Sequence, residues 1–376
     1  MNKLGFGFLR LPRLDPLDEK SIDFDLLCTM VDRFLERGGR YFDTAYTYLG
    51  GTSEEALRKT LVERYPREQY LIADKLPGFE VKTEADNQRF FEESLSRCGV
   101  DYFDVYLLHG INEENYEIAQ RFHQFSFLAE LKAAGKVKKI GFSFHDTAQL
   151  LDRILTEHPE VDYVQLQINY LDWDSLSVQS RQCWETAVRH GKRILVMEPV
   201  KGGSLADIPE EAAKHLRVLC PNDSPARWAI RFASEPEAVK VVLSGMSSVE
   251  QIEDNMRDVE PLTQEEHAAL RQAAEIICSS TAIACTGCGY CVSGCPGGIA
   301  IPQYFALFNE YKRNPSELWK SEIVCHSISR TAGRPADCIG CGLCEKRCPQ
   351  KLPVTRWLTE VKKSFFAEED VLEEKD

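Results

Sequence analysis

Two cysteine runs near the C-terminal end have the residue types and the spacing of ligands for a metal cluster. The first run comprises Cys285, Cys288, Cys291 and Cys295, with a proline directly after it. The second run repeats this spacing and the final proline with Cys338, Cys341, Cys344 and Cys348. Three thiolates spaced three residues apart can wrap one corner of an iron–sulfur cube. The fourth thiolate, beyond a longer gap and before a proline, points away from the other three.

Over roughly residues 278–355 this pattern resembles bacterial dicluster ferredoxins, in which the fourth cysteine of each run binds the other cluster. The resemblance implies two [4Fe–4S] clusters. One would be held by Cys285, Cys288, Cys291 and Cys348, and the other by Cys338, Cys341, Cys344 and Cys295. Zinc and disulfides are the alternatives, although zinc sites usually pair two Cys-x-x-Cys clips and do not need three clips and a Cys-Pro. The 42 residues between the runs exceed those of a minimal ferredoxin, and we expect them to be largely helical.

A second set of polar residues stands where predicted strands end, in the N-terminal part of the chain. Asp43 ends one strand, Tyr48 follows five residues later, and Lys75 and His109 end the next two strands. This set suits carbonyl reduction, because a carbonyl that accepts a hydride needs a proton on its oxygen. A tyrosine with an ordinary pKa near 10 is a poor acid at neutral pH, and a neighbouring ammonium would lower that pKa. Lys75 would supply the ammonium, Asp43 would hold Lys75, and His109 would orient the carbonyl.

Over roughly residues 1–260 the sequence resembles the aldo/keto reductases. The matching segments are Asp43–Tyr48, Leu71–Lys75, Val105–Gly110, Ile140–Ser143 and Gln165–Tyr170. The resemblance implies that Tyr48 is the general acid, that Lys75 and Asp43 tune it, and that His109 orients the substrate. It also implies direct hydride transfer between a nicotinamide cofactor, NAD(H) or NADP(H), and a small carbonyl or alcohol.

The same resemblance suggests the contacts of that cofactor, with some departures. Ser143 and Gln167 match the contacts to the carboxamide, although Phe144 stands where the family has Asn. Met197 takes the place of the aromatic residue that stacks on the nicotinamide ring. The remaining candidates are Gly202 and Gly203, for the pyrophosphate or simply as a tight loop, and Asp254 and Asn255 at the adenine.

Two cations that commonly neutralise the 2′-phosphate of NADPH are missing from the sequence. Gly245 replaces a lysine and Gln251 replaces an arginine. Since the phosphate would lose both partners, the sequence favours NADH or weak discrimination.

Eight apolar runs alternate with amphipathic stretches over the first 260 residues, which predicts a (β/α)8 TIM barrel and leaves an open doubly wound sheet as the alternative. The predicted strands are Leu4–Leu9, Tyr41–Ala45, Tyr70–Lys75, Val105–His109, Lys139–Ser143, Tyr163–Gln167, Ile194–Glu198 and Val239–Ser244. The predicted helices are Ile22–Arg37, Ser53–Tyr65, Thr83–Cys98, Tyr116–Ala134, Thr147–Glu157, Ser175–His190 and Pro225–Ala233. We expect a barrel over residues 1–262, a linking helix over 263–278 that is capped by Thr263–Glu266, a mostly helical cluster domain over 279–366, and an acidic tail over 367–376.

The composition of the chain limits the classes of partner that it could bind. A net charge of −14 over 376 residues argues against nucleic acids and anionic membranes as partners, and no apolar run has the length of a membrane span. No signal peptide is apparent, and eight of the 14 cysteines belong to the two runs. Because clusters need reduced thiolates, we expect a cytoplasmic protein.

The two sets of residues leave the role of the clusters open. A hydride carries two electrons and a [4Fe–4S] cluster carries one. The clusters would therefore form an electron path to a ferredoxin or another redox partner, or they would be structural or redox-sensing. In a third interpretation, the chain is an electron-transfer protein with a degenerate barrel.

Overall fold

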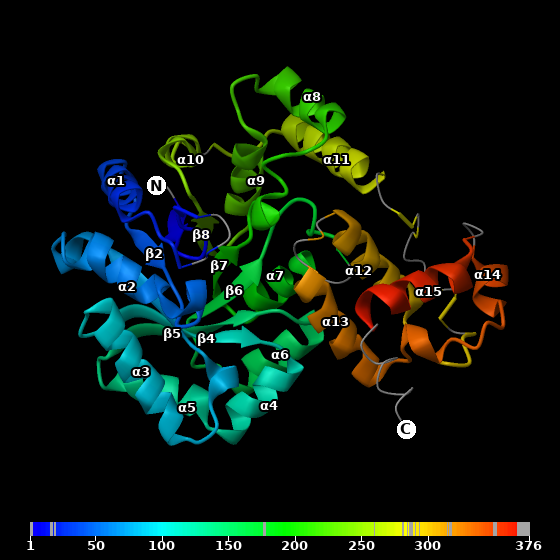
Figure 1. The fold of residues 1–376 in the computed structure, drawn as a ribbon, viewed down its shortest axis with the longest axis horizontal. Helices are drawn as coiled ribbons and strands as arrows, with labels where there is room; N and C mark the ends of the chain where they lie inside the picture. Colours follow the sequence, from blue (N-terminus) through cyan, green and yellow to red (C-terminus); the bar gives the residue numbers. More distant parts are fainter. Residues whose placement is uncertain are drawn as a thin grey trace. The chain divides into compact units, whose positions relative to one another are not determined.

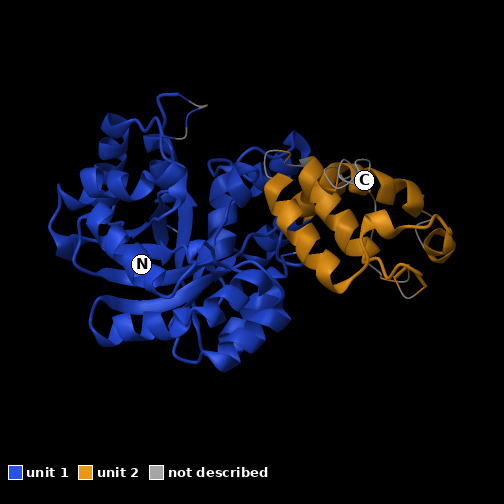
Figure 2. Ribbon diagram, turned by 60° about the horizontal axis from the view of Figure 1, so that its bottom comes forward, with its two compact units in different colours: residues 1–174, 178–271 blue, residues 175–177, 272–376 orange. Residues whose placement is uncertain are grey.

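The computed structural model describes residues 3–15, 18, 20–175, 178–258, 260–279, 282–283, 285, 289, 291–292, 294–313, 315, 318–348 and 352–366. Cys288 and the acidic tail at 367–376 lie outside the described residues. The chain folds into two compact units, and the boundary falls after Arg271 (Figure 2). The first unit contains residues 1–174 and 178–271, and the second contains residues 175–177 and 272–376.

Eight parallel strands close a barrel in the first unit, in the order of the sequence. The strands are β1 (Leu4–Gly7), β2 (Tyr41–Asp43), β3 (Leu71–Leu76), β4 (Phe103–Ile111), β5 (Val137–Phe144), β6 (Tyr163–Gln167), β7 (Arg193–Met197) and β8 (Val239–Gly245). The barrel closes where Gly7 of β1 pairs with Gly245 of β8. The TIM barrel is therefore confirmed, and the open sheet is excluded.

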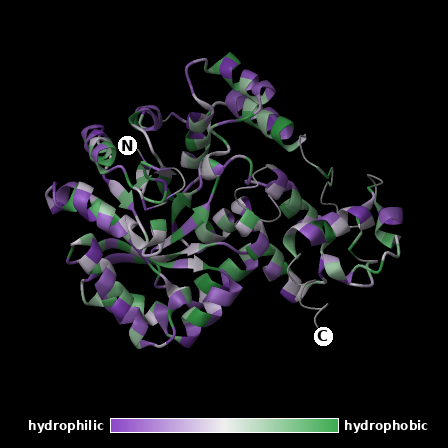
Figure 3. Ribbon diagram, viewed as in Figure 1, coloured by the Kyte–Doolittle hydropathy of each residue, from purple (hydrophilic) through white to green (hydrophobic). Residues whose placement is uncertain are grey.

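Helices lie around this barrel (Figure 1). They are α1 (Phe24–Glu36), α2 (Ser53–Leu57), α3 (Ala85–Cys98), α4 (Glu113–Arg121), α5 (Gln124–Ala133), α6 (Ala148–Glu157), α7 (Ser180–Arg189), α8 (Glu210–Leu219), α9 (Pro225–Ser234) and α10 (Val249–Asn255). Strand β7 is predominantly hydrophobic, whereas the helices alternate hydrophilic and hydrophobic residues (Figure 3). This pattern is typical of a parallel sheet covered by amphipathic helices.

Three details differ from the predicted elements. The single helix predicted over Tyr116–Ala134 is two helices, because His123 adopts a left-handed backbone with φ of 52°. The helix predicted over Ser53–Tyr65 is α2 followed by a π-helical segment at Arg58–Val62. Helices α8 and α10 were not predicted.

The second unit contains α12 (Ile301–Arg313), α13 (Leu318–Thr331), α14 (Leu343–Arg347) and α15 (Val354–Phe365). Its core packs α12 against α15 through apolar side chains such as Phe305, Phe308, Leu358 and Val361. The cysteines at 291 and 344 are buried in this same core. The mostly helical character expected between the cysteine runs is confirmed by α12 and α13.

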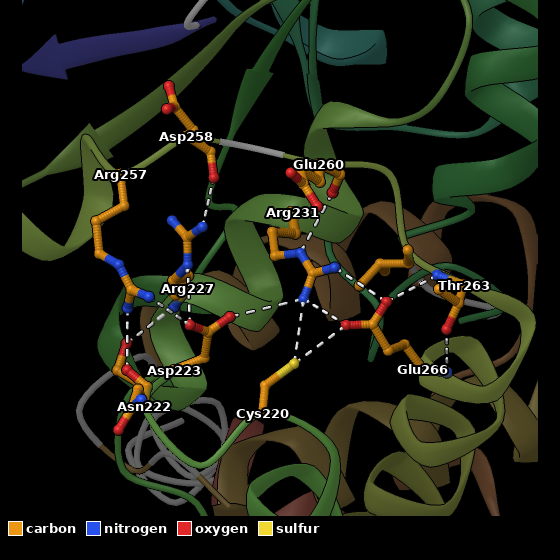
Figure 4. Close-up of polar contacts among 12 residues, drawn as sticks. Cys220, Asn222, Asp223, Arg227, Arg231, Arg257, Asp258, Glu260, Thr263 and Glu266 are labelled. Atoms are coloured by element: carbon orange, nitrogen blue, oxygen red, sulfur yellow. Dashed lines mark hydrogen bonds and ion pairs between the residues drawn. The ribbon is translucent and has the colours of Figure 1, made fainter.

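Helix α11 (Gln264–Ser279) begins in the first unit and ends in the second. Its start is capped by Thr263 and Glu266, as predicted, and the two residues form a capping box. The Thr263 N–H donates to Glu266 Oε2 at 2.8 Å, and the Glu266 N–H donates to Thr263 Oγ1 at 3.2 Å. Both Glu266 carboxylate oxygens also accept hydrogen bonds from the Arg231 guanidinium of α9, at 2.7 and 3.0 Å (Figure 4). A buried ion pair therefore fixes the first turn of α11 to the barrel unit.

Candidate active site and metal centres

Strands β2 and β3 bring Asp43, Tyr48 and Lys75 together at the carboxyl end of the barrel. The Lys75 ammonium donates to Asp43 Oδ1 at 2.5 Å, to the Thr44 carbonyl at 2.8 Å and to the Tyr48 hydroxyl at 3.2 Å. The Lys75 side chain is 1% exposed, so this contact takes place out of water. The spacing in the sequence thus gives a tyrosine hydroxyl that touches a buried cation.

The loop that carries Tyr48 is held in place by polar contacts of its own. The Thr44 and Ser53 hydroxyls lie 2.7 Å apart, and the Ser53 hydroxyl donates to the Phe8 carbonyl at 2.9 Å. Directly after Tyr48, Leu49 takes a left-handed conformation with φ of 52°. A non-glycine residue in that conformation costs free energy, which the surrounding contacts must offset. These contacts therefore hold the loop, and with it the Tyr48 phenol, in one position.

Burial controls the charges of this group. Burial lowers the pKa of Lys75, but the neighbouring Asp43 and Tyr48 outweigh it and raise that pKa above its usual value. Lys75 is therefore an ammonium at neutral pH. For Tyr48, burial raises the pKa and Lys75 only partly offsets this, so the pKa lies above its ordinary value. The net lowering that the sequence led us to expect is wrong, because the phenolate is desolvated more strongly than the ammonium stabilises it.

His109 of β4 completes the group. Its ring lies edge-on to the Tyr48 ring, with the centroids 5.6 Å apart. Burial, followed by the positive charges of Lys75 and His145, holds the pKa of His109 well below its usual value, so the imidazole is neutral. Its Nδ1 is buried and makes no hydrogen bond to any of the described residues. A buried polar atom without a partner is costly, so a ligand that formed a hydrogen bond with it would remove that cost.

Candidate contacts for the nicotinamide lie on β5, β6 and β7. The Ser143 hydroxyl is buried and accepts a hydrogen bond from the Gly110 N–H at 2.8 Å. Gln167 and Met197 are paired neighbours in the sheet, at the carboxyl ends of β6 and β7. All three residues therefore lie on strands that end at the same mouth as Tyr48 and Lys75.

A buried network that the sequence did not reveal fixes the orientation of Gln167. Its amide nitrogen donates to Asp172 Oδ2 at 2.7 Å, and Asn169 donates to the same oxygen at 2.7 Å. The Lys201 ammonium contacts both Asp172 oxygens, at 2.7 and 2.9 Å. The amide nitrogen of Gln167 is thereby held toward Asp172. In the sequence, the only indication of this network was Lys201, which stands directly before two glycines.

The candidate contacts for the pyrophosphate and the adenine are in different settings. Gly202 and Gly203 both have positive φ, and a Cβ on Gly203 would meet nothing within 4 Å, so a ligand could approach this backbone closely. Asp254 accepts a hydrogen bond from the Ser224 hydroxyl, and the Asn255 amide donates to the Ser244 hydroxyl at 3.2 Å. The last two residues therefore also hold α9, α10 and β8 together.

The cysteine runs are described apart from Cys288. Cys291 and Cys344 are buried and Cys341 is exposed, while the others are half-buried: Cys285, Cys295, Cys338 and Cys348. Gly340 and Gly342 flank Cys341 with φ of 68° and 69°, and a Cβ on either would meet nothing within 4 Å. Glycines with open space beside them let a cluster approach the backbone closely, and thiolates are the ligands of such clusters. The residues of this loop therefore fit an iron–sulfur cluster.

Comparisons with known proteins match both halves of this description. Residues 3–275 match the family model "Aldo/keto reductase family". The chain belongs to the aldo/keto reductase family. Residues 284–352 match the model "4Fe-4S dicluster domain", so this family member carries an iron–sulfur domain after its barrel. As a member of the family, the protein is an oxidoreductase.

Relatives and solved structures are similar to the barrel. An aldo-keto reductase of Mycobacterium avium is 26% identical over 238 residues, which are 62% of this chain and 76% of the relative. L-galactose dehydrogenase of Arabidopsis thaliana is 26% identical over 259 residues, which are 63% of this chain and 79% of the relative. The structure of a Bacillus halodurans aldo-keto reductase in its holo form has a TM-score of 0.56 at 25% identity and covers 72% of this chain and 91% of its own.

Proposed function

We propose that this aldo/keto reductase reduces the carbonyl of a small substrate, or oxidises the corresponding alcohol, with a nicotinamide cofactor and with Tyr48 as the general acid. The observation that carries the proposal is the hydrogen bond at 3.2 Å between the buried Lys75 ammonium and the hydroxyl of the half-buried Tyr48, beside the buried Asp43. A phenol in contact with a permanent cation can release its proton and keep the resulting phenolate stable.

The reaction assigns one task to each residue. His109 is neutral and donates one ring N–H to the carbonyl oxygen, which orients the substrate. The bound nicotinamide cofactor supplies or accepts the hydride. Tyr48 transfers its hydroxyl proton to the oxygen of the substrate as negative charge develops there. Lys75 stabilises the phenolate that results, and Asp43 fixes the position of Lys75. In the direction of alcohol oxidation, the phenolate accepts the proton again.

The residues that would hold the cofactor are Ser143, Gln167, Met197, Gly202, Gly203, Asp254 and Asn255. Asp172 and Lys201 would act on it indirectly, because they keep the amide nitrogen of Gln167 occupied and leave its carbonyl oxygen to accept from a carboxamide. The printed titles of two solved structures from Klebsiella pneumoniae name NADPH in one and NADP in the other, at TM-scores of 0.55 and at 18% and 19% identity. That likeness shows the fold alone.

We also propose that the two cysteine runs hold two [4Fe–4S] clusters and pass single electrons to a ferredoxin or another redox partner. The match to a dicluster domain supports the clusters, and the exposure of Cys341 supports an electron path that reaches the surface of the second unit. Within the described residues, no helix is long and apolar enough to cross a membrane. We expect the protein to work in the cytoplasm, where thiolates stay reduced.

The substitution Tyr48→Phe tests the proposal. It removes the proton and keeps the ring, so the kcat for reduction of a generic aldehyde should fall by about 10² to 10⁴. Tyr46→Phe is the matched control, because the Tyr46 hydroxyl lies on the same loop and donates to Glu93 at 2.6 Å. Turnover by Tyr48→Phe equal to that of the unchanged protein would contradict the role of Tyr48.

A second candidate function is electron transfer alone, with the barrel as a docking module. The departures Phe144, Gly245 and Gln251 from the family contacts favour it. Equilibrium dialysis of the full chain against NADH and NADPH separates the two candidates: binding of neither nucleotide would favour the second.

A further inference from the structure

The second cysteine run reaches the surface of the second unit between two apolar side chains. Cys341 is exposed. Ile339, two residues before it, is 72% exposed, and Leu343, two residues after it, is 39% exposed. Neither of these side chains belongs to the apolar core that packs α12 against α15. Exposed apolar side chains that flank a functional group are typical of a surface that contacts another molecule.

Helices α14 and α15 place two cations near this run. Glu345 of α14 accepts hydrogen bonds from the Thr355 N–H at 2.9 Å and from the Thr355 hydroxyl at 2.6 Å, which ties α14 to the first turn of α15. The residue that follows each of these two is an exposed cation, Lys346 on α14 and Arg356 on α15. Within the part of the chain that the structure describes, neither cation forms an ion pair. Both can therefore pair with carboxylates of another molecule.

The segment that contains these cations differs in charge from the rest of the chain. Residues 334–366 contain seven lysines and arginines and three aspartates and glutamates, whereas the whole chain has 45 and 59. Within the segment, Arg334 and Lys363 are paired with carboxylates at 3.3 and 3.0 Å. The positive charge at Lys346 and Arg356 can therefore attract an acidic molecule to this place on an otherwise acidic chain.

The chemistry of this surface favours a small acidic protein over larger anions. A nucleic acid or an anionic membrane extends beyond the two cations and would face the acidic remainder of the chain, whose net charge is −14 overall. A small protein can touch the surface at Cys341 alone, because charges farther away than about 10 Å are largely screened by salt. Since Cys341 belongs to a run that matches a dicluster domain, the partner that fits is one that exchanges electrons.

We propose a docking surface for a small acidic protein that carries single electrons. The surface, here called the cluster face, consists of Ile339, Cys341, Leu343, Lys346 and Arg356. Its apolar side chains exclude water at the centre of the contact, and its two cations pair with carboxylates at the rim, as in small transient interfaces. In one direction the carrier is oxidised by one electron, which reduces the cluster held by the cysteines, with no proton or leaving group. The inference rests on the proposed function, since it names the partner of the proposed clusters.

The test measures the Kd between the full chain, purified without oxygen, and an acidic plant-type ferredoxin, by isothermal titration calorimetry. Binding should weaken by about tenfold as the salt concentration rises from about 0.02 M to about 0.3 M, because salt screens the charges. At the lower salt concentration, Lys346→Glu and Arg356→Glu should each weaken binding by about threefold to tenfold. Lys214→Glu is the matched control. It makes the same change of charge at an exposed residue of α8 in the first unit and should change Kd by less than about twofold.

Ile339→Ser separates the apolar contact from the charges, because it should weaken binding at both salt concentrations. Equal losses in Lys214→Glu and Lys346→Glu would overturn the inference, since binding would then follow the net charge of the chain. Dimers of the unchanged protein that Lys346→Glu disrupts, with no binding of ferredoxin, would also overturn it and assign the cluster face to a second copy of the chain. Failure of an iron-loaded chain to bind ferredoxin would overturn the inference and leave the proposed clusters intact, whereas a chain that holds no iron would overturn both.

Discussion

The barrel site and the cysteine loops differ in what completes them. The barrel brings Asp43, Tyr48 and Lys75 from two strands and a loop into contact through protein atoms alone, with Asp43 and Lys75 buried and Tyr48 half-buried. The candidate cysteine ligands come in two short runs of the sequence, and Cys341 lies exposed between glycines with open space beside them. The first site is made by the fold. In our proposal, the second is completed by an inorganic cluster that the cysteines hold.

This difference predicts how each site responds to the loss of one of its side chains. A buried ion pair that loses one partner leaves an unpaired charge, which costs about 3 to 5 kcal/mol. A cluster ligand that is lost removes metal from a loop and leaves the barrel unchanged. The substitutions below should therefore separate the two sites, with the largest effects in the barrel.

Lys75→Met should have the largest effect. It removes the cation that stabilises the Tyr48 phenolate and leaves Asp43 buried without its partner, so carbonyl reduction should fall by about 100-fold or more. Steady-state kinetics and the iron content of the same preparation check this. Iron should stay at the level of the unchanged protein, and a parallel loss of iron would mean that the two sites are not separate.

The pH dependence of carbonyl reduction should be flat through neutrality. Tyr48 must be protonated to act, and its raised pKa keeps it so, with activity falling about tenfold per pH unit only above that pKa. His109 must be neutral, and its lowered pKa keeps it neutral as the pH falls from 7 to 6. The profile of kcat/KM measures both pKa values. A loss of activity centred near the usual histidine pKa would contradict the burial of His109.

Glu266→Gln should weaken the start of α11. Burial raises the pKa of Glu266, but hydrogen bonds from Arg231 and the Thr263 N–H outweigh it and hold the pKa at about 2. A carboxyl whose pKa is depressed on folding stabilises the fold above its unfolded pKa and loses that contribution as the pH falls toward 2. Urea unfolding at pH 7 should show a loss of about 1.5–3 kcal/mol, with the variant and the unchanged protein converging near pH 2. An equal difference in the free energy of unfolding at both pH values would exclude the Glu266 carboxylate as the cause.

Cys348→Ser should affect the clusters alone. If the fourth cysteine of each run serves the other cluster, about half of the iron should be lost, and it should be the cluster of the first run. Carbonyl reduction should be unchanged. Cys325→Ala is the control, because Cys325 is buried in the second unit and belongs to neither run. Loss of the cluster of the second run, with the cluster of the first run retained, would show that each run binds its own cluster.

Periodicity and spacing predicted most of the architecture. The eight strands and the meeting of Asp43, Tyr48 and Lys75 follow from a rule of the barrel, in which polar residues at strand ends share one mouth. Features that depend on packing between distant segments could not be predicted. The Asp172–Lys201 ion pair, for example, joins two loops that lie far apart in the sequence.

The pKa shifts of the site residues were predicted less well than the positions of these residues. The sequence places an ammonium beside Tyr48, but it does not show how deeply the phenol is buried, and burial decides the direction of the pKa shift. The break between α4 and α5 was not predicted either. His123 adopts a left-handed conformation there, which neither its residue type nor the neighbouring residues indicate.

Metal and sulfide analysis of the full chain, purified without oxygen, tests the central claim most directly. The claim is that one chain joins a proton-donating barrel site to two clusters held by crossed cysteine runs. It predicts about eight iron atoms per chain, an equal amount of acid-labile sulfide and no stoichiometric zinc. Stoichiometric zinc, or about four iron atoms or fewer per chain, would contradict it.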